Sequence, residues 1–252
     1  DKGPDKTFLA LELVAGGTLH AYMNKLRESE ARLCSIREML SVSSCVISAL
    51  QVLQKARIAH RDIKPENLLV SSEVDGHVNV KLADFGDATH VIGPCSGARG
   101  KCGTLEYRAP EVIKGLEHGS AVDVWALGVL LFEMMNGYTP FSWQGGGTKN
   151  TSEININENT MRYPLKFPDD DDTDEDNEED DEGKRREPTE VAARVQIKAR
   201  IVRMLEKDPA NRMKVPSQQR ESQCQGTTAK KSSSMHSRRE IQRASNVRAS
   251  VR

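Results

Sequence analysis

The chain has 252 residues, with 36 Lys and Arg against 37 Asp and Glu, and a formal net charge of -1. This length fits one folded domain with additional segments, or two small domains. The longest uninterrupted apolar stretch, residues 129–132, is far too short to cross a bilayer, and no secretory hydrophobic segment stands at the N-terminus. Five cysteines without CxxC spacing indicate reduced thiols in the cytoplasm or nucleus. The composition therefore predicts an intracellular protein without a membrane span.

The first predicted elements are a strand and two helices. Residues 8–14 are predicted to form a short buried strand, which the Gly16-Gly17 pair ends. Thr18 can cap a short helix that follows. Residues 37–56 then carry apolar side chains at helical spacing and predict a longer helix.

The middle of the chain predicts a hairpin and a buried helix. Two strand-like runs, residues 68–70 and 78–82, flank a turn at residues 75–76. Residues 121–136 are apolar nearly all round, which is typical of a helix in the middle of a core. Gly137 is suited to end that helix. The fold class predicted is therefore mainly α, with helices around a buried central helix and a small β-hairpin.

After this helix the pattern indicates less order. The glycines at 145–147, the Asn-rich residues 154–159 and the acidic run at 169–182 together indicate a long insertion. One last amphipathic helix is expected to follow. Its predicted buried face consists of Val195, Ala199, Val202 and Leu205.

Composition divides the chain into four predicted segments. Residues 1–165 are the main folded part, and residues 166–190 are an acidic disordered insertion. Residues 191–216 hold the last helix, and residues 217–252 form a basic disordered tail. Because no aromatic residues interleave with the basic residues of the tail, no specific nucleic-acid binding is expected.

The strongest chemical signal is the run HRDIKPEN at residues 60–67. It places a carboxylate, a cation and an amide in one loop before the predicted hairpin. Phosphoryl transfer needs an aligned hydroxyl, neutralised phosphate charge and held metal ions. Asp62 can accept the proton of the attacking hydroxyl, Lys64 can face the transferring phosphate, and Asn67 can ligate magnesium.

Two further motifs follow in order. The run DFG at residues 84–86 comes directly after a predicted strand, and Asp84 would supply the second magnesium ligand. The run APE stands at residues 109–111, after Thr104 in a Gly-Thr pair. Together the three motifs resemble the eukaryotic-type serine/threonine protein kinases. The resemblance implies ATP and Mg²⁺ as cofactors, and a protein substrate whose acceptor is serine or threonine because of Lys64 and Thr104.

The resemblance also implies adenine contacts. Residues 11–17, LELVAGG, are similar to the hinge of kinases, in which the Glu12 carbonyl and the Val14 backbone would bond the adenine. Leu69 would touch the adenine from below. The alternative for this segment is an ordinary buried strand and turn.

Further contacts follow from the same resemblance. They are Asp123 with backbone amides of the catalytic loop, His60 with Phe85, and Glu111 with Arg212. Glu66 resembles the acidic residue with which basophilic kinases bind an upstream arginine, so a basic substrate is expected. Thr18, however, stands where such enzymes often have a second acid.

The sequence departs from the family in two places. No G-x-G-x-x-G loop, Val-Ala-x-Lys lysine or partner glutamate stands before the hinge-like segment, so an incomplete kinase fold is expected, a large C-terminal lobe with weak activity or none by itself. The alternative is a truncated or pseudokinase-like regulatory or binding module. Gly100 stands where many such kinases carry an acceptor threonine. Ser96 is then the hypothetical switch, and constitutive ordering without phosphate is the alternative.

Overall fold

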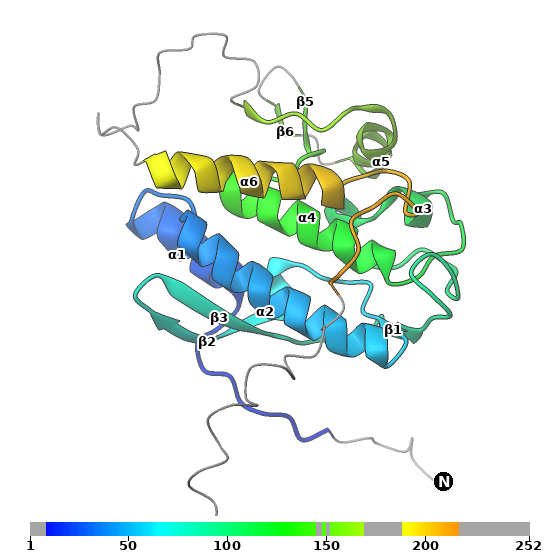
Figure 1. Cartoon of the computed structure of the whole chain (residues 1–252), viewed down its shortest axis with the longest axis horizontal. Helices are drawn as coiled ribbons and strands as arrows, with labels where there is room; N and C mark the ends of the chain where they lie inside the picture. The colour runs from blue at the N-terminus through cyan, green and yellow to red at the C-terminus, as the bar shows by residue number, and fades with distance from the viewer. Residues whose placement is uncertain (1–8, 145–147, 150–151, 169–187, 217–252) are drawn as a thin grey trace, which may run out of the picture. The chain divides into compact units, whose positions relative to one another are not determined.

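The structure is a computed structural model that describes residues 9–144, 148–149, 152–168 and 188–216 (Figure 1). The statements that follow concern these residues. The centre of the predicted acidic insertion, residues 169–187, and the whole predicted basic tail lie outside the described residues. Phe8, the first residue of the predicted strand, also lies outside them.

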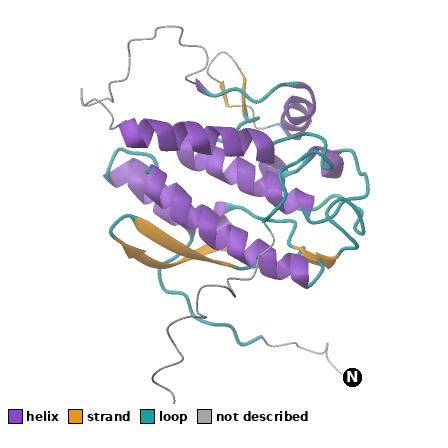
Figure 2. Ribbon diagram, viewed as in Figure 1, coloured by secondary structure: helices purple, strands orange, loops and turns teal. Residues whose placement is uncertain are grey.

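The described part of the chain is mainly helical, with small antiparallel sheets (Figure 2). The helices are α1 (Leu19–Ser29), α2 (Ile36–Lys55), α3 (Pro110–Ile113), α4 (Ala121–Asn136), α5 (Glu153–Arg162) and α6 (Pro188–Met204). The strands are β1 (Ile58–Ala59), β2 (Leu68–Val74), β3 (His77–Leu82), β4 (Thr89–His90), β5 (Trp143–Gln144) and β6 (Thr148–Lys149), paired as β1–β4, β2–β3 and β5–β6. Two short 3-10 helices are η1 (Pro65–Asn67) and η2 (Leu105–Tyr107). The predicted mainly α class is confirmed.

Helix α1 begins where the sequence predicts. Gly17 takes the left-handed φ of +76°, and the Thr18 hydroxyl then accepts a hydrogen bond from the Ala21 amide at 3.1 Å. This bond satisfies one of the free amides of the first turn. The apolar side chains of Leu19, Tyr22, Met23 and Leu26 are buried.

Helix α4 is the centre of the core, as predicted. Figure 1 shows it between α2 and α6, and α4 packs against both. Fourteen of its residues are buried, and Gly137 ends it with a φ of +82°. A Cβ atom at Gly128 would lie 2.8 Å from the Cβ of Met204, so this glycine permits the close approach of α6.

Helix α2 is fixed at its N-terminus by a capping box. Ser35 and Glu38 exchange hydrogen bonds between their side chains and backbone amides. By length and composition alone α2 could cross a membrane, with a mean hydropathy of 1.4. A search of the sequence for uninterrupted apolar runs did not single out this helix as a candidate membrane span, because polar residues divide its apolar side chains. In the fold its apolar face packs against β3 and α4, as in the core helix of a globular domain.

The β2–β3 hairpin carries the loop that follows β1. Its turn lies at Asp75 and Gly76, both with positive φ, as predicted. At the open end of the hairpin, the Asn67 carbonyl accepts a hydrogen bond from the Ala83 amide at 2.8 Å. The hairpin therefore holds the end of one loop beside the start of the next, which brings residues 60–67 and 84–87 together.

The predicted buried strand at residues 8–14 is wrong for its described residues. Residues 9–14 form no strand, and Leu9, Leu11 and Leu13 are 81%, 83% and 90% exposed. An extended segment is buried only when another segment pairs with it and covers one face. Within the described residues no strand pairs with this segment.

The lower order expected at residues 154–159 is not found, because these residues lie in helix α5. Ile156 and Thr160 are four residues apart and therefore share a buried face. The Asn159 amide donates to the Phe141 carbonyl at 3.0 Å. The asparagines that suggested less order thus include one that secures the helix to the core.

Helix α6 begins at Pro188, inside the predicted disordered segment, and ends at Met204, well before residue 216. Its predicted face is also wrong except at Leu205. Val195 and Val202 are exposed, whereas the buried residues are Ile197, Ile201 and Met204. Both sets fit helical spacing, so the pattern alone did not decide between them. Phe167, also within the predicted insertion, is buried against Phe132.

Candidate active site

The loop at residues 60–67, called the catalytic loop below, is anchored from beneath by the first turn of α4. The Asp123 carboxylate accepts hydrogen bonds from the His60 amide at 2.9 Å and the Arg61 amide at 2.8 Å, as expected. Burial raises the pKa of Asp123 to about 6, although both bonds act to lower it. These bonds hold Arg61 at a left-handed φ of +68°. The side chain that follows, Asp62, is thereby directed into the site.

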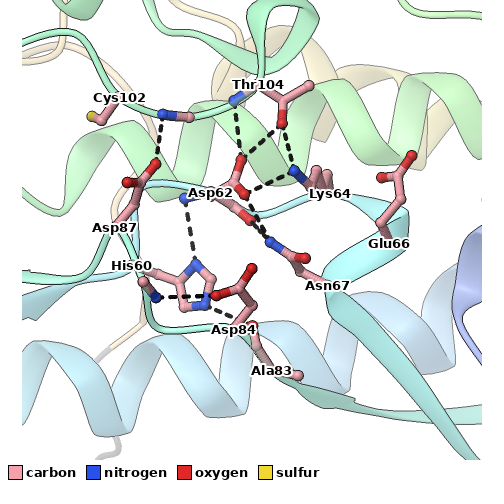
Figure 3. A network of polar contacts seen from close by, with 12 residues as sticks. His60, Asp62, Lys64, Glu66, Asn67, Ala83, Asp84, Asp87, Cys102 and Thr104 are labelled. Atoms are coloured by element: carbon pink, nitrogen blue, oxygen red, sulfur yellow. Dashed lines mark hydrogen bonds and ion pairs between the residues drawn. The ribbon is translucent and has the colours of Figure 1, made fainter. Parts of the chain in front are cut away.

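Asp62 is the centre of the polar network in Figure 3. Its Oδ1 accepts hydrogen bonds from the amide and the hydroxyl of Thr104, at 3.0 and 2.9 Å. Its Oδ2 accepts from Lys64 Nζ at 2.8 Å and from Asn67 Nδ2 at 2.9 Å. Burial by itself raises the pKa of this carboxyl, but the hydrogen bonds from Lys64 and Thr104 outweigh it and hold the pKa below its usual value. Asp62 is therefore ionised at neutral pH.

Lys64 joins the two halves of this network. Its ammonium group donates to the Thr104 hydroxyl at 2.7 Å as well as to Asp62 (Figure 3). The structure thus brings together the three predicted catalytic residues Asp62, Lys64 and Asn67. A positive group, a carboxylate and a hydroxyl meet where a phosphate and an acceptor hydroxyl could be aligned.

Asn67 and Asp84 offer oxygen atoms suited to magnesium. Both hydrogen bonds of the Asn67 side chain use Nδ2, with the carbonyl and the carboxylate of Asp62, so its Oδ1 is the atom presented to a ligand. Asp84 takes a φ of +58°, and its Oδ1 accepts from the Gly86 amide at 3.1 Å. Within the described residues no group of three or more His, Cys, Asp or Glu side chains could hold a metal ion by itself. One carboxylate and one amide oxygen nevertheless fit Mg²⁺, which usually completes its shell with phosphate and water.

His60 supports the loop before Asp84. Its ring is fully buried, and its Nε2 lies 3.0 Å from the Ala83 carbonyl oxygen. It contacts the Phe85 ring edge-on, as expected, with the ring centroids 4.9 Å apart. Burial lowers the pKa of His60, so the ring is neutral at pH 7. The ring therefore packs as an uncharged support for the backbone of residues 83–85.

The predicted adenine contacts are brought together only in part. The Val70 amide donates to the Gly17 carbonyl at 2.9 Å, and Thr18 pairs with Leu69 in an isolated bridge. These contacts place the end of the hinge-like segment against the start of β2, where Leu69 lies. The Glu12 side chain pairs with Lys81 at 2.5 Å, and Val14 is half-buried. No described contact links Glu12 or Val14 to Leu69.

A buried ion pair supports the segment after the site. Arg212 donates to both oxygens of the Glu111 carboxylate, at 2.6 and 2.9 Å, and its guanidinium lies over the Trp125 ring. Both charged side chains are almost fully buried. The expected pair of Glu111 and Arg212 is confirmed.

The sequence-based interpretation missed two acidic residues near Glu66. The Tyr107 hydroxyl donates to Glu133, and the carboxylates of Glu66 and Glu106 lie near enough to raise the pKa of Glu133, to which burial contributes most. A signal for Glu133 was present, because it is an acid within the apolar stretch that follows Asp123 in this helix. Glu106 carried no such signal.

Comparison with known proteins gives one family and many relatives. The family described as "Protein kinase domain" matches residues 2–222. The chain is 40% identical over 141 residues to the cAMP-dependent protein kinase catalytic subunit PRKX of Mus musculus, covering 55% of this chain and 36% of that protein. It is 41% identical over 139 residues to the cAMP-dependent protein kinase catalytic subunit of Dictyostelium discoideum, covering 54% and 19%. With protein kinase C zeta type of Oryctolagus cuniculus it shares 36% over 166 residues, covering 65% and 26%. The chain thus spans well under half the length of these relatives.

Proposed function

We propose, because the chain belongs to the protein kinase family, that it takes part in transferring the γ-phosphoryl group of ATP to serine or threonine hydroxyls of proteins. The observation that carries this proposal is the network in which Asp62 is bonded by Lys64, Asn67 and Thr104. Phosphoryl transfer depends on alignment and charge stabilisation more than on covalent help from the protein. This network supplies both.

In the proposed reaction, Asp62 orients the acceptor hydroxyl and takes its proton. The bond from the hydroxyl oxygen to the γ-phosphorus forms as the bond to the β–γ bridging oxygen breaks, and ADP leaves. The low pKa of Asp62 keeps it ionised before the reaction, which suits a group that orients a hydroxyl. Lys64, 2.8 Å from Asp62 Oδ2, is placed to offset negative charge on the transferring phosphoryl group.

We assign Asn67 Oδ1 and the Asp84 carboxylate as the magnesium ligands. Bound Mg²⁺ would neutralise charge on the β- and γ-phosphates. The fixed orientation of the Asn67 amide supports this assignment, because its nitrogen is already committed to Asp62. For the adenine we retain the Glu12 carbonyl, the Val14 backbone and the Leu69 side chain, of which Leu69 pairs with Thr18, directly after the hinge-like segment.

We further propose that the 252 residues supply the large-lobe part of the site. A phosphate-covering loop and its lysine would then come from outside these 252 residues. The sequence contains no G-x-G-x-x-G run, and in the described residues each sheet has two strands. Removal of one electrostatic contact of this kind commonly costs about 3–4 kcal/mol of barrier. The 252 residues alone are therefore expected to be weak or inactive, and a regulatory module that binds nucleotide without activity is the second candidate.

A basic substrate is the preference we propose. The carboxylates of Glu66 and Glu106 both lie near enough to Glu133 to raise its pKa, and Glu66 lies in the catalytic loop itself. An arginine upstream of the acceptor serine would offset their mutual repulsion. The half-exposed Glu66 is the residue most open to such a contact.

An intracellular location remains part of the proposal. Cys34, Cys45, Cys95 and Cys102 are free thiols in the described residues. This agrees with a reducing compartment, the cytoplasm or the nucleus.

The decisive experiment measures transfer of labelled γ-phosphate from Mg-ATP to a serine peptide with upstream arginines. The matched peptides carry threonine or tyrosine at the acceptor, or glutamine in place of the arginines. We expect weak transfer to serine and threonine from the 252 residues alone, and an Asp62→Asn variant with about 10²- to 10⁴-fold less activity but unchanged unfolding. Transfer that survives Asp62→Asn would refute the assignment of the base. Magnesium-dependent nucleotide binding without transfer would favour the regulatory module.

A further inference from the structure

Asp87, the residue directly after the DFG run, contacts two segments of the site at once. Its carboxylate Oδ2 accepts a hydrogen bond from the Gly103 amide at 2.9 Å (Figure 3). Its backbone carbonyl accepts from Arg61 Nε at 2.7 Å. Asp87 therefore links the catalytic loop to the segment that carries Thr104.

These contacts close a ring around Asp62. The ring runs from Asp62 to its neighbour Arg61, then to Asp87, to Gly103, to Thr104, and back to Asp62 through the two hydrogen bonds that Thr104 donates. Each link is a peptide bond or a hydrogen bond of 3.0 Å or less. A shift of Gly103 would therefore be passed to Thr104 and to the Asp62 carboxylate.

Gly103 is held in a tight place within this ring. It takes a left-handed φ of +72°, and a Cβ atom there would lie 2.4 Å from the Arg61 carbonyl oxygen. From the other side Arg108 donates to the carbonyls of Cys102 and Gly103, at 3.2 and 3.0 Å. The amide of Gly103 thus has one described side-chain acceptor, and that acceptor is Asp87.

We propose that Asp87 is a positioning residue that holds Thr104 against Asp62, and that it orders the segment that carries Thr104 without a phosphate. The inference rests on the proposed function for its catalytic consequence, but the hydrogen-bond ring is independent of it. Kinases that need activation commonly use an added phosphate to bridge such segments to an arginine. Here the carboxylate and the carbonyl of Asp87 already occupy the bridge between Gly103 and Arg61.

The remainder of the segment is also tied by unmodified groups. Ala98 and His118 exchange two backbone hydrogen bonds of 2.9 Å, and Glu117 accepts from the Gly97 amide at 2.9 Å. Ser96, the hypothetical switch, lies in a tight turn where its carbonyl accepts from residues 92 and 93. The side-chain and amide contacts described for Arg61 run to Asp87 and Asp123, not to Ser96.

The test uses the full chain and three variants. Asp87→Ala removes the carboxylate, Asp87→Asn keeps an oxygen that can accept from Gly103, and Arg99→Ala breaks an exposed ion pair on the same segment as a control. Hydrogen exchange at the Gly103 and Thr104 amides is measured with and without phosphatase treatment. We expect exchange at least about 10-fold faster in Asp87→Ala, near wild type in Asp87→Asn and Arg99→Ala, and unaffected by phosphatase.

Kinetics provide the second readout wherever phosphoryl transfer is detected. Asp87→Ala is expected to lower kcat by about 10- to 100-fold with little change in the KM for ATP, and Asp87→Asn to recover most of the loss. Unchanged amide exchange in Asp87→Ala, or loss of protection in the wild type after phosphatase, would overturn the proposal. Absence of transfer in every protein, the wild type included, would bear only on the proposed activity of these 252 residues, because the exchange measurement still decides the role of Asp87.

Discussion

The catalytic loop and the hinge-like segment were both recognised from short sequence patterns, yet they differ in how they contact the rest of the fold. The catalytic loop is hydrogen-bonded to three other parts of the fold: to α4 through Asp123, to the DFG segment through Arg61, and to residue 104 through Asp62. Residues 9–14 have exposed leucines and one exposed ion pair, between Glu12 and Lys81. The difference shows that the loop obtains its geometry from the described elements, whereas the segment does not.

Breaking the buried ion pair of Glu111 and Arg212 should give the largest effect on stability. In Glu111→Ala the Arg212 guanidinium would stay buried without its carboxylate, which typically costs 3–5 kcal/mol, so we expect a loss of about that size. Urea unfolding measures it. The matched control is Glu158→Ala, which breaks the exposed pair with Arg162 and should cost less than about 0.5 kcal/mol. Equal losses in the two variants would remove the distinction between anchored and exposed regions.

The anchor of the catalytic loop should show itself in pH dependence. Because the pKa of Asp123 rises from 3.8 to about 6 on folding, the folded state holds this proton more tightly than the unfolded state. The contribution of Asp123 to stability is therefore complete below about pH 4 and is lost as the pH rises to about 6. The total loss is on the order of 3 kcal/mol, at about 1.4 kcal/mol per pKa unit.

The measurement is the difference in unfolding free energy between the wild type and Asp123→Asn at several values between pH 4 and pH 8. This subtraction removes the contributions of other titrating groups to the pH dependence. One of them is His60, whose lowered pKa makes stability rise with pH in part of this range. We expect the difference to fall up to about pH 6 and then to stay level. A difference that rises with pH would mean that the two amides stabilise the carboxylate more than burial disfavours it.

How much could be predicted from the sequence follows the same division. Helix α4, with its capping Gly137, was predicted to the residue because a segment apolar on every side has one favourable environment. The contacts of Asp123 and of Glu111 were predicted from the family resemblance and are present. Where two apolar stripes overlapped, as in α6, the pattern did not choose between Ile197 and Val195.

The functional residues that were missed are those defined by tertiary contacts. Asp87 and Glu106 are ordinary acids in the sequence, and their importance is visible only when Gly103 and Glu133 lie beside them. The strand predicted at residues 8–14 failed for the converse reason. A local apolar pattern was present, but the described residues provide no strand to pair with it.

The smallest effect is expected in the exposed segment, where one substitution allows a direct comparison. Leu13→Ala should change the free energy of unfolding by less than about 0.5 kcal/mol, because Leu13 is 90% exposed. Leu50→Ala, the same substitution at a residue 2% exposed in α2, should cost about 2–5 kcal/mol. Both values come from urea unfolding of the full chain. A loss above about 1 kcal/mol in Leu13→Ala would mean that residues 9–14 are packed in solution. The segment would then be ordered like the catalytic loop and would differ from it only in the residues that it contacts.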